Sequence, residues 1–538
     1  MKTFYRRRMT SSVTTLFFGL MVTAMPAWAA APTCSKTNIR FSVSSNVLTV
    51  TGPAVCTLSE IKTAYPSAPL ELTDSVNKVW QLRTNLILEK GASLVLHGTS
   101  VGGDVNELRL QSNNSSAAGS FVYLRADWGN ISISKTKITS WNAAANGPDT
   151  EYATYGRSYI HVRSRLDADG VTPHESRMDV IDSDIGYLGY YAAESYGLTW
   201  KVSGSSPGLF DKVNVLGDIR NSKIHHNYFG VYTYGAYGMT LAGNEVHNNI
   251  QYGIDPHDDS DSLTIDRNDV HHNGNHGIIC SQRCDHLTIS NNESHHNTGV
   301  GIMLHRNAND SLLENNTLYN NGDAGIAIFD SHHDTVRGNN SYNNRYGLRF
   351  SVGSSDNIIQ NNSFSNNTSY GIFFYQGTDA PTINNGRPSR NRLTGNTVSN
   401  NAGYAVILKE GDSNIFEKNK FLDNKGGGIQ IYSAKPTGNQ FIGNEWRRNA
   451  RYGFSITDGL ETLIDDNTID GHPNGVYLLS TTGANVKNNT ISNSTTAAIT
   501  LDKSSNNSVT DNRLTANTKA IIQKNGSSGN TISGNTIN

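Results

Sequence analysis

A small residue followed by an apolar residue recurs through most of this chain. The pair occurs at Gly230-Val231, Gly253-Ile254, Gly277-Ile278, Gly301-Ile302, Gly325-Ile326, Gly347-Leu348, Gly371-Ile372, Ala405-Val406, Gly428-Ile429, Gly453-Phe454, Gly475-Val476 and Ala498-Ile499. Successive pairs are 23, 24, 24, 24, 22, 24, 34, 23, 25, 22 and 23 residues apart. Asn-rich stretches precede most of them. A period of this size is typical of a solenoid.

The residues inside each repeat distinguish between two kinds of solenoid. Leucine-rich repeats need a regular ladder of leucines and a helix-forming segment, whereas these repeats are short, β-branched and rich in Asn, Ser, Thr and Gly. The pattern therefore predicts an all-β fold, a right-handed parallel β-helix with about three short strands in each coil. We expect Val, Ile and Leu inside the coils, and Asn at the turns in left-handed backbone, bonded to neighbours one coil away.

The chain divides into three predicted regions. Residues 1–29 have the form of a signal peptide, because arginines at 6–8 precede an apolar stretch and Ala27-Trp28-Ala29 resembles a cleavage site. We therefore expect a mature protein in the periplasm or outside the cell, with no further membrane span. Residues 30–130 repeat only weakly and are expected to cap or extend the solenoid, while residues 131–538 are expected to form the β-helix with the active site.

Four cysteines are compatible with an oxidising compartment. Cys34 and Cys56 are positioned to close a loop ahead of the clear repeats. Cys280 and Cys284 are too far apart along a straight strand to pair, so a bridge between them requires a sharp turn at Arg283.

Composition limits the possible functions. The 538 residues include 50 glycines and 13 prolines, 36% of them are hydrophobic, and the formal net charge is −2. A solenoid of this length can grow along its axis without dividing into globular domains. The near-neutral charge argues against a dedicated nucleic-acid-binding protein.

One long interval interrupts the period. The 34 residues between Gly371 and Ala405 contain the segment 378–387, an insertion of about ten residues over the base period. Insertions of this kind form loops on one face of a solenoid, often the binding face.

A dense polar cluster interrupts the apolar repeat at Tyr252-Gly-Ile-Asp-Pro-His-Asp-Asp259. In a strand, Asp255 and His257 project from one face, while Ile254 points to the core. The neighbouring repeats place Tyr232, Ile279, Met303 and Ala327 in the column of Asp255, and Tyr234, Ser281, His305 and Phe329 in the column of His257.

Cations are expected beside this cluster. Arg283 falls in the column of Asp259, so His257 and Arg283 are expected to flank one sugar ring. Lys223 and Arg306 are expected to extend a cationic strip on either side, and Asp258, Asp259 and His305 to complete the binding surface. A base with a fixed cation suits proton abstraction next to a carboxylate, because the cation stabilises the charge of the resulting carbanion. Arginine binds a carboxylate through two hydrogen bonds, and histidine is a base near neutral pH.

The string from Tyr252 to Asp259, followed by His276-Gly-Ile-Ile279, resembles the alginate (mannuronan) C-5 epimerases, especially the periplasmic ones. The resemblance covers residues 221–362. It implies conversion of mannuronate to guluronate within a polymer, with His257 as the base, Arg283 neutralising the carboxylate, and Tyr252, Asp255 and Lys223 beside them. The family has its arginine one place earlier relative to the Gly-Ile pair, and a shift of one residue in a strand turns a side chain to the other face.

Other functions remain open at the level of sequence. A polysaccharide lyase would use the same proton abstraction but expel the 4-oxygen, and a non-catalytic β-helix could bind or export carbohydrate. The expected partners are an acidic polysaccharide, polymannuronate or alginate, and other exopolysaccharide biosynthesis or export proteins. No cofactor and no metal are expected. The paired histidines at 225–226, 271–272, 295–296 and 332–333 recur at repeat spacing and are interpreted as surface ladders, with a metal site from stacked histidines as the alternative.

Overall fold

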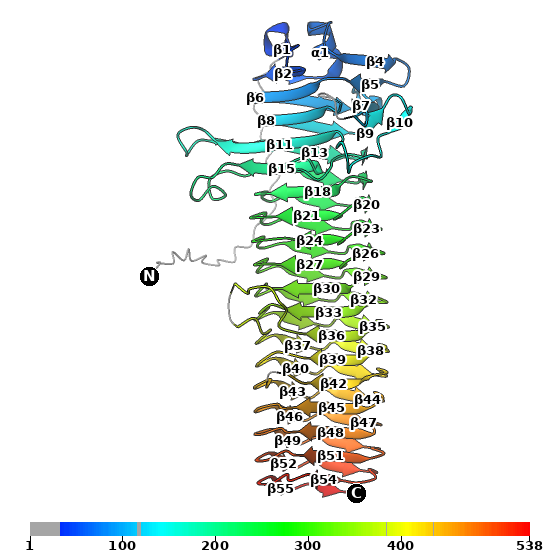
Figure 1. The fold of residues 1–538 in the computed structure, drawn as a ribbon, viewed down its shortest axis with the longest axis vertical. Helices are drawn as coiled ribbons and strands as arrows, with labels where there is room; N and C mark the ends of the chain where they lie inside the picture. The colour runs from blue at the N-terminus through cyan, green and yellow to red at the C-terminus, as the bar shows by residue number, and fades with distance from the viewer. Residues whose placement is uncertain (1–32, 116–119, 383–384, 434) are drawn as a thin grey trace, which may run out of the picture.

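A computed structural model describes residues 33–115, 120–382, 385–433 and 435–538, and the expected signal peptide lies outside them. The described residues form a long stack of parallel β-coils, with the N-terminal region at one end and the C-terminus at the other (Figure 1). This confirms the predicted fold class. None of the helices in the described residues has the length and apolar character needed to cross a bilayer.

Each regular coil contributes one strand to each of three faces, as predicted. On the first face lie β15 (Gly197–Ser203), β18 (Phe229–Tyr234), β21 (Ile254–His257), β24 (Ile278–Cys280), β27 (Ile302–His305), β30 (Ala324–Phe329), β33 (Tyr346–Ser351) and β36 (Tyr370–Phe374), and the series continues to β54 (Ile521–Lys524). On the second face lie β16 (Asp218–Arg220), β19 (Thr240–Ala242), β22 (Thr264–Asp266), β25 (Thr288–Ser290) and β28 (Leu312–Glu314), continuing to β55 (Thr531–Ser533). On the third face lie β14 (Asp184–Gly186), β17 (Lys223–His225), β20 (Glu245–His247), β23 (Asp269–His271), β26 (Glu293–His295) and β29 (Thr317–Tyr319), continuing to β56 (Thr536–Ile537).

The recurring glycine has a steric cause. A Cβ on Gly253 would lie 2.6 Å from the carbonyl oxygen of Gly277 in the next coil, and the same carbonyl-to-glycine approach occurs at Gly301 and Gly347. Only glycine or a small residue lets the backbones stack this closely. The apolar partner of each pair points inward, where Ile254, Ile278 and similar residues are completely buried.

The asparagines serve two structural roles, where the sequence suggested one. Left-handed turn positions are exposed residues such as Arg267, Asn291 and Asn315. The next residue is a buried asparagine, and these form ladders inside the coil. Asn292, for example, donates from Nδ2 to the carbonyl of Ile265 at 2.8 Å and to Oδ1 of Asn316 at 3.0 Å. The ladder therefore satisfies the polar groups that each turn buries.

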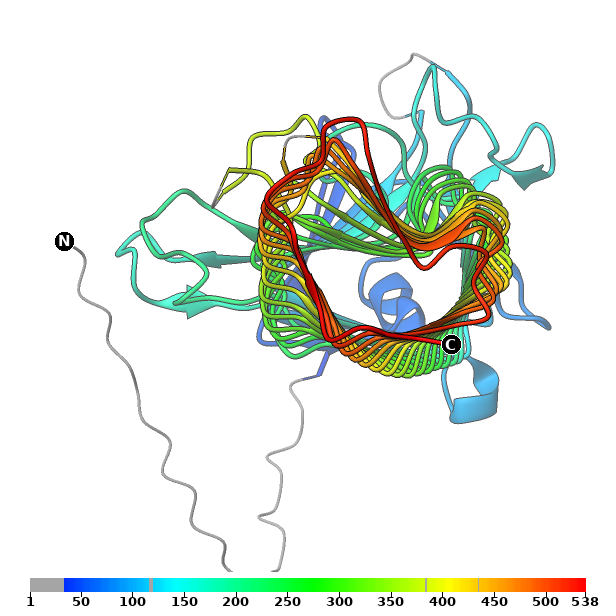
Figure 2. The same cartoon turned by 90° about the horizontal axis from the view of Figure 1, so that it is seen from below.

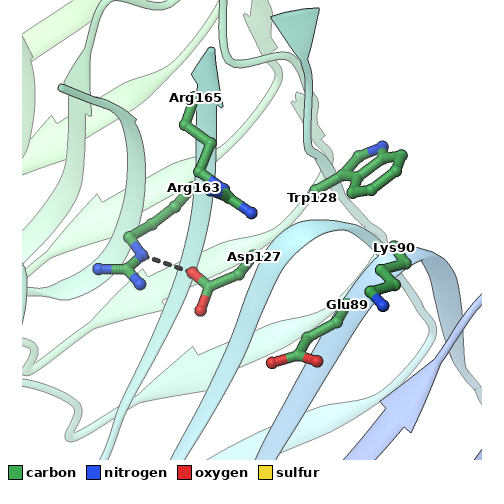
Figure 3. Close-up of a pocket in the computed structure, with 6 residues that line it drawn as sticks. All are labelled: Glu89, Lys90, Asp127, Trp128, Arg163 and Arg165. Carbon is green, nitrogen blue, oxygen red and sulfur yellow. Dashed lines mark hydrogen bonds and ion pairs between the residues drawn. The ribbon is translucent and has the colours of Figure 1, made fainter. Parts of the chain in front are cut away.

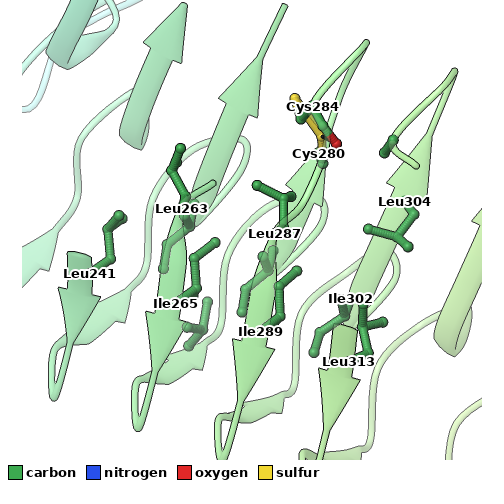
Figure 4. Close-up of a cluster of buried hydrophobic side chains, with 14 of the residues drawn as sticks. Leu241, Leu263, Ile265, Cys280, Cys284, Leu287, Ile289, Ile302, Leu304 and Leu313 are labelled. Atoms are coloured by element: carbon green, nitrogen blue, oxygen red, sulfur yellow. Dashed lines mark hydrogen bonds between the residues drawn. A yellow bond between two sulfur atoms is a disulfide. The ribbon is translucent and has the colours of Figure 1, made fainter. Parts of the chain in front are cut away.

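Apolar side chains fill the interior in columns. Leu241, Ile265, Ile289 and Leu313 stack from coil to coil, and Figure 4 shows them beside Cys280 and Cys284. These two cysteines are buried and form a disulfide. The sequence predicted that this disulfide requires a sharp turn at Arg283. Arg283 has φ of 48°, and the chain turns there. Cys34 and Cys56 also pair.

The N-terminal region closes one end of the stack. Its elements include β1 (Ile39–Ser42), β2 (Val47–Thr51), β3 (Val55–Cys56), α1 (Leu58–Ala64), β4 (Leu70–Asp74), β5 (Val79–Leu82), β6 (Asn85–His97), β7 (Glu107–Gln111) and β8 (Tyr123–Ser134). Figure 2 shows α1 within the outline of the coils, with its Leu58 and Ile61 buried. Strand β2 pairs in parallel with β6, and β6 with β8, so parallel stacking begins before the expected boundary at residue 130.

Candidate active site

The polar cluster lies on β21, in a cleft on the first face. The pairing of β18 with β21 puts Tyr232 beside Asp255 and Tyr234 beside His257. In the coils beyond, Ile279 pairs with Met303. Both pairings agree with the columns predicted from the repeat. The open cleft has a volume of about 380 Å³. It is lined by Tyr196, Phe229, Tyr232, Tyr252, Asp255, His257, His276, Ile279, Ser281, Gln282, Met303, His305 and Arg306.

His257 is held at the edge of the cleft by a chain of charged groups. Its Nδ1 lies 2.8 Å from Oδ2 of Asp258, and Arg283 donates to the other oxygen of Asp258. Arg283 also donates to Asp259 at 3.0 Å. Burial lowers the pKa of His257, but the hydrogen bond that its ring donates to Asp258 and the charges of Asp255 and Asp258 outweigh burial, so the pKa is raised. These contacts orient the ring and leave Nε2 available.

Asp255 forms the floor of the cleft. It is 1% exposed and accepts a hydrogen bond from Ser281 Oγ at 2.8 Å. Burial raises the pKa of Asp255 to about 7, against the lowering effects of His257 and Ser281. Burial therefore favours the protonated carboxyl, which is able to donate as well as accept a hydrogen bond.

Aromatic rings form one wall. Tyr196 packs on Phe229 with centroids 4.7 Å apart, and Tyr252 stacks on His276 at 5.4 Å. Burial, and secondly the charge of Asp255, raise the pKa of Tyr252. At neutral pH its phenol keeps its proton, which suits it to donate rather than to accept one.

A second cation, Arg306, reaches the cleft from the end of β27, two coils beyond β21. Arg306 is an exposed lining residue, and its Nη2 donates to Asp379 at 3.0 Å. Beside it, burial and the charge of Arg306 lower the pKa of His305 to about 4, so His305 is neutral at pH 7.

Asp379 belongs to the insertion after β36, which forms a loop and reaches back to Arg306 of an earlier coil. Thr382 anchors it by donating from its backbone nitrogen to Asp330 at 3.1 Å. A second excursion, residues 204–217 after β15, reaches Tyr234 through Phe210 at 5.4 Å between ring centroids. Both excursions project from the same side of the stack and flank the coils of the cleft (Figure 1).

The structure separates two of the expected cations from the cleft. Lys223 lies on β17 of the third face, because the chain turns between β16 and β17. There it pairs with Glu245 at 2.7 Å. It therefore does not extend a cationic strip beside His257. Arg283 is not among the lining residues, since its side chain is occupied by Asp258 and Asp259. Asp258, His305 and Arg306 are close to His257 as expected.

Several lining residues were not singled out from the sequence. Gln282 is the most informative: it stands five places after Gly277, just as Arg306 stands five places after Gly301. Counting this position across coils would have found both. Tyr196 and Phe229 carry no local signal, because their contact joins segments from different coils.

A second hollow of about 320 Å³ lies near the N-terminal end and has different chemistry. It is lined by Glu89, Lys90, Asp127, Trp128, Arg163 and Arg165 (Figure 3). Arg163 pairs with Asp127 at 2.5 Å. None of the six is a histidine.

The sequence matches a known family over most of the coils. The profile of the family described as "Right handed beta helix region" matches residues 200–309, 257–387 and 385–537. The chain belongs to this right-handed β-helix family. The family assignment agrees with the handedness predicted for the parallel connections.

Curated relatives match part of this β-helix protein. It is 33% identical over 162 residues to a mannuronan C5-epimerase of Pseudomonas fluorescens, covering 30% of this chain and 27% of the relative. It is 30% identical over 198 residues to the mannuronan C5-epimerase AlgG of Azotobacter vinelandii, covering 36% of this chain and 33% of the relative. The matched segment thus spans a third or less of each relative's length.

A solved structure shares the fold. The crystal structure of the periplasmic alginate epimerase AlgG superposes with a TM-score of 0.59 and 21% identity, covering 70% of this chain and 84% of the other.

Proposed function

We propose that this protein is a polyuronate C-5 epimerase that converts mannuronate to guluronate within a polymer, in the periplasm or outside the cell. The observation that carries the proposal is His257, oriented by Asp258 at the edge of an open cleft that also contains Arg306 and the buried Asp255. The names of the curated relatives support the same reaction. The expected leader at 1–29 and the periplasmic AlgG structure support the location.

The proposed reaction needs one proton acceptor and one donor. Neutral His257 takes the C-5 proton; the C–H bond breaks, and its electron pair delocalises into the adjacent carboxylate as an enolate. Tyr252, whose raised pKa keeps its phenol protonated, delivers a proton to the opposite face of C-5. The new C–H bond inverts the centre, and solvent then returns a proton to Tyr252 and removes one from His257.

The carboxylate of the substrate requires its own partners. We assign Arg306 to this role, because it lines the cleft, whereas Arg283 is bound to two carboxylates of the protein. Binding then exchanges Asp379 for the substrate carboxylate as the partner of Arg306. Asp255 in its protonated form donates a hydrogen bond to the same carboxylate, which stabilises the enolate as its charge develops. Arg283 acts indirectly, by fixing Asp258 and through it His257.

The cleft also suits a chain of sugars. Tyr196, Phe229 and Tyr252 present aromatic surface beside the polar floor, a combination that supports packing of sugar rings. Residues that line the cleft come from β18, β21, β24 and β27, so a polymer lying across several coils would contact them. An acidic polysaccharide, polymannuronate or alginate, is therefore the proposed substrate, and the proteins that make or export it are the proposed partners.

Proton NMR of polymannuronate incubated with the purified protein in D₂O tests the proposal. An epimerase going through an enolate yields guluronate that carries deuterium at C-5. Unsaturated chain ends instead of guluronate would make the protein a lyase with the same base. Binding of the polymer with neither product would make it a carbohydrate-binding β-helix, and would overturn the proposal.

A further inference from the structure

A ladder of histidines runs along the third face, on the same coils as the cleft but on a different side of the molecule. His225, His247, His271 and His295 stack in successive coils, with ring centroids 5.3, 5.1 and 5.0 Å apart. Their strands β17, β20, β23 and β26 pair in register. The proposed epimerase reaction uses none of them.

The two outer histidines are satisfied through Nε2. That atom of His225 lies 2.8 Å from Asp184 Oδ1, and that of His295 lies 3.0 Å from Asp269 Oδ1. Because a carboxylate only accepts hydrogen bonds, Nε2 of His225 and Nε2 of His295 must each carry a proton.

The two central histidines differ. His247 Nδ1 lies 2.7 Å from Asn248 Oδ1, an acceptor, so Nδ1 carries the proton and Nε2 presents a lone pair. His247 Nε2 faces Glu245 Oε1 at 3.6 Å, and His271 Nε2 faces the same oxygen at 3.8 Å, both too long for hydrogen bonds.

From this geometry we propose that Glu245, His247 and His271 bind a divalent transition-metal ion of the zinc type. The three ligand atoms lie within 4.8 Å of one another. Zinc bound to nitrogen and oxygen at about 2.0–2.2 Å in tetrahedral geometry brings its ligands to roughly 3.3–3.5 Å from each other, a small contraction from the distances here. Imidazole and carboxylate are suitable zinc ligands, and water completes the coordination.

Lys223 gives the site a built-in competitor. Its Nζ lies 2.7 Å from Oε2 of Glu245 and leaves Oε1 facing the histidines. A metal bound there joins β20 to β23 and ties two coils together on the face away from the substrate, so it acts on stability and not on turnover.

Zinc titration of the untagged, EDTA-treated full chain tests the site, using calorimetry and, with Co²⁺ as the probe, visible absorption. We expect one ion per chain and a cobalt spectrum of a four-coordinate site. His271→Gln should weaken zinc binding at least tenfold. Lys223→Met should strengthen it, because Glu245 loses its competing cation.

His295→Gln is the matched control, since this ring belongs to the same ladder but its Nε2 is already bonded. It should change zinc affinity less than threefold. Absence of stoichiometric binding, or equal affinities for the wild type and His271→Gln, would overturn the proposal. Equal weakening by His271→Gln and His295→Gln would show diffuse binding along the ladder and would also overturn it. Turnover of polymannuronate is measured separately, so failure of the proposed epimerase activity leaves this test intact.

Discussion

The first and third faces of the same coils are built from the same repeat but differ in what their columns contain. On the third face the column repeats one residue type, with His247 above His271 above His295. On the first face the column through Asp255 changes at every step, from Tyr232 to Ile279. A repeated column gives a ladder of like residues. A changing column creates a single position with its own electrostatics, and the buried Asp255 beneath His257 is that position.

The largest expected contrast compares one histidine from each face. His257→Gln should lower turnover of polymannuronate by about 10²–10⁴, the typical effect of losing a general base. His271→Gln should leave turnover within about twofold. Deuterium incorporation at C-5 and melting curves of both variants provide the measurement. Normal incorporation by a folded His257→Gln protein would refute the assignment of His257 as the base.

The second contrast separates two arginines. Arg306→Ala should lower turnover by about 10²–10³, by analogy with loss of an oxyanion donor, because no other cation among the described lining residues faces the substrate carboxylate. Arg283→Ala should cost less, since it loosens Asp258 but removes no substrate contact. Steady-state kinetics of both variants decide the point. A greater loss in Arg283→Ala would return the carboxylate-binding role to Arg283, as the sequence alone suggested.

The third prediction concerns the scaffold that both faces share. Asn292→Ala should lower the free energy of unfolding by about 1–3 kcal/mol, because it leaves the buried partners of its side chain unsatisfied. Asn315→Gly is the control: Asn315 is exposed with φ of 55°, a conformation that glycine adopts without strain. Urea denaturation followed by circular dichroism should show a change within about 0.5 kcal/mol for the control. Equal effects would mean that the ladder adds no stability.

The smallest predicted effect is a shift in pH dependence. His257 must be neutral to accept a proton, so activity should rise with pH as His257 loses its proton at its raised pKa. Asp258 stabilises the protonated ring, and Asp258→Asn should therefore lower that pKa and move the acid limb of kcat/KM to lower pH. If the acid limb of the kcat/KM profile stays at the same pH in Asp258→Asn, or moves to higher pH, Asp258 does not set the pKa of His257.

Much of this protein was readable from its sequence, because a solenoid is built from local periodicity. The spacing of the Gly-apolar pairs predicted the parallel coils, and the alternation along a strand placed Ile254 inside and His257 outside. The resemblance carried by residues 252–259 pointed to the reaction now proposed. The two roles of the asparagines were merged into one, since adjacent turn residues differ in burial and not in type.

Only the tertiary structure decided which groups meet at the cleft. Arg283 lies in a left-handed turn that directs its side chain to Asp258 and Asp259, and a backbone reversal of this kind is invisible to column counting. Lys223 lies on another face because the coil turns between strands. Asp379 reaches Arg306 across 73 residues, through an insertion whose length the sequence gives and whose direction depends on long-range contacts such as Thr382 with Asp330. Local periodicity determines the coils, while contacts distant in sequence determine the chemistry of the cleft.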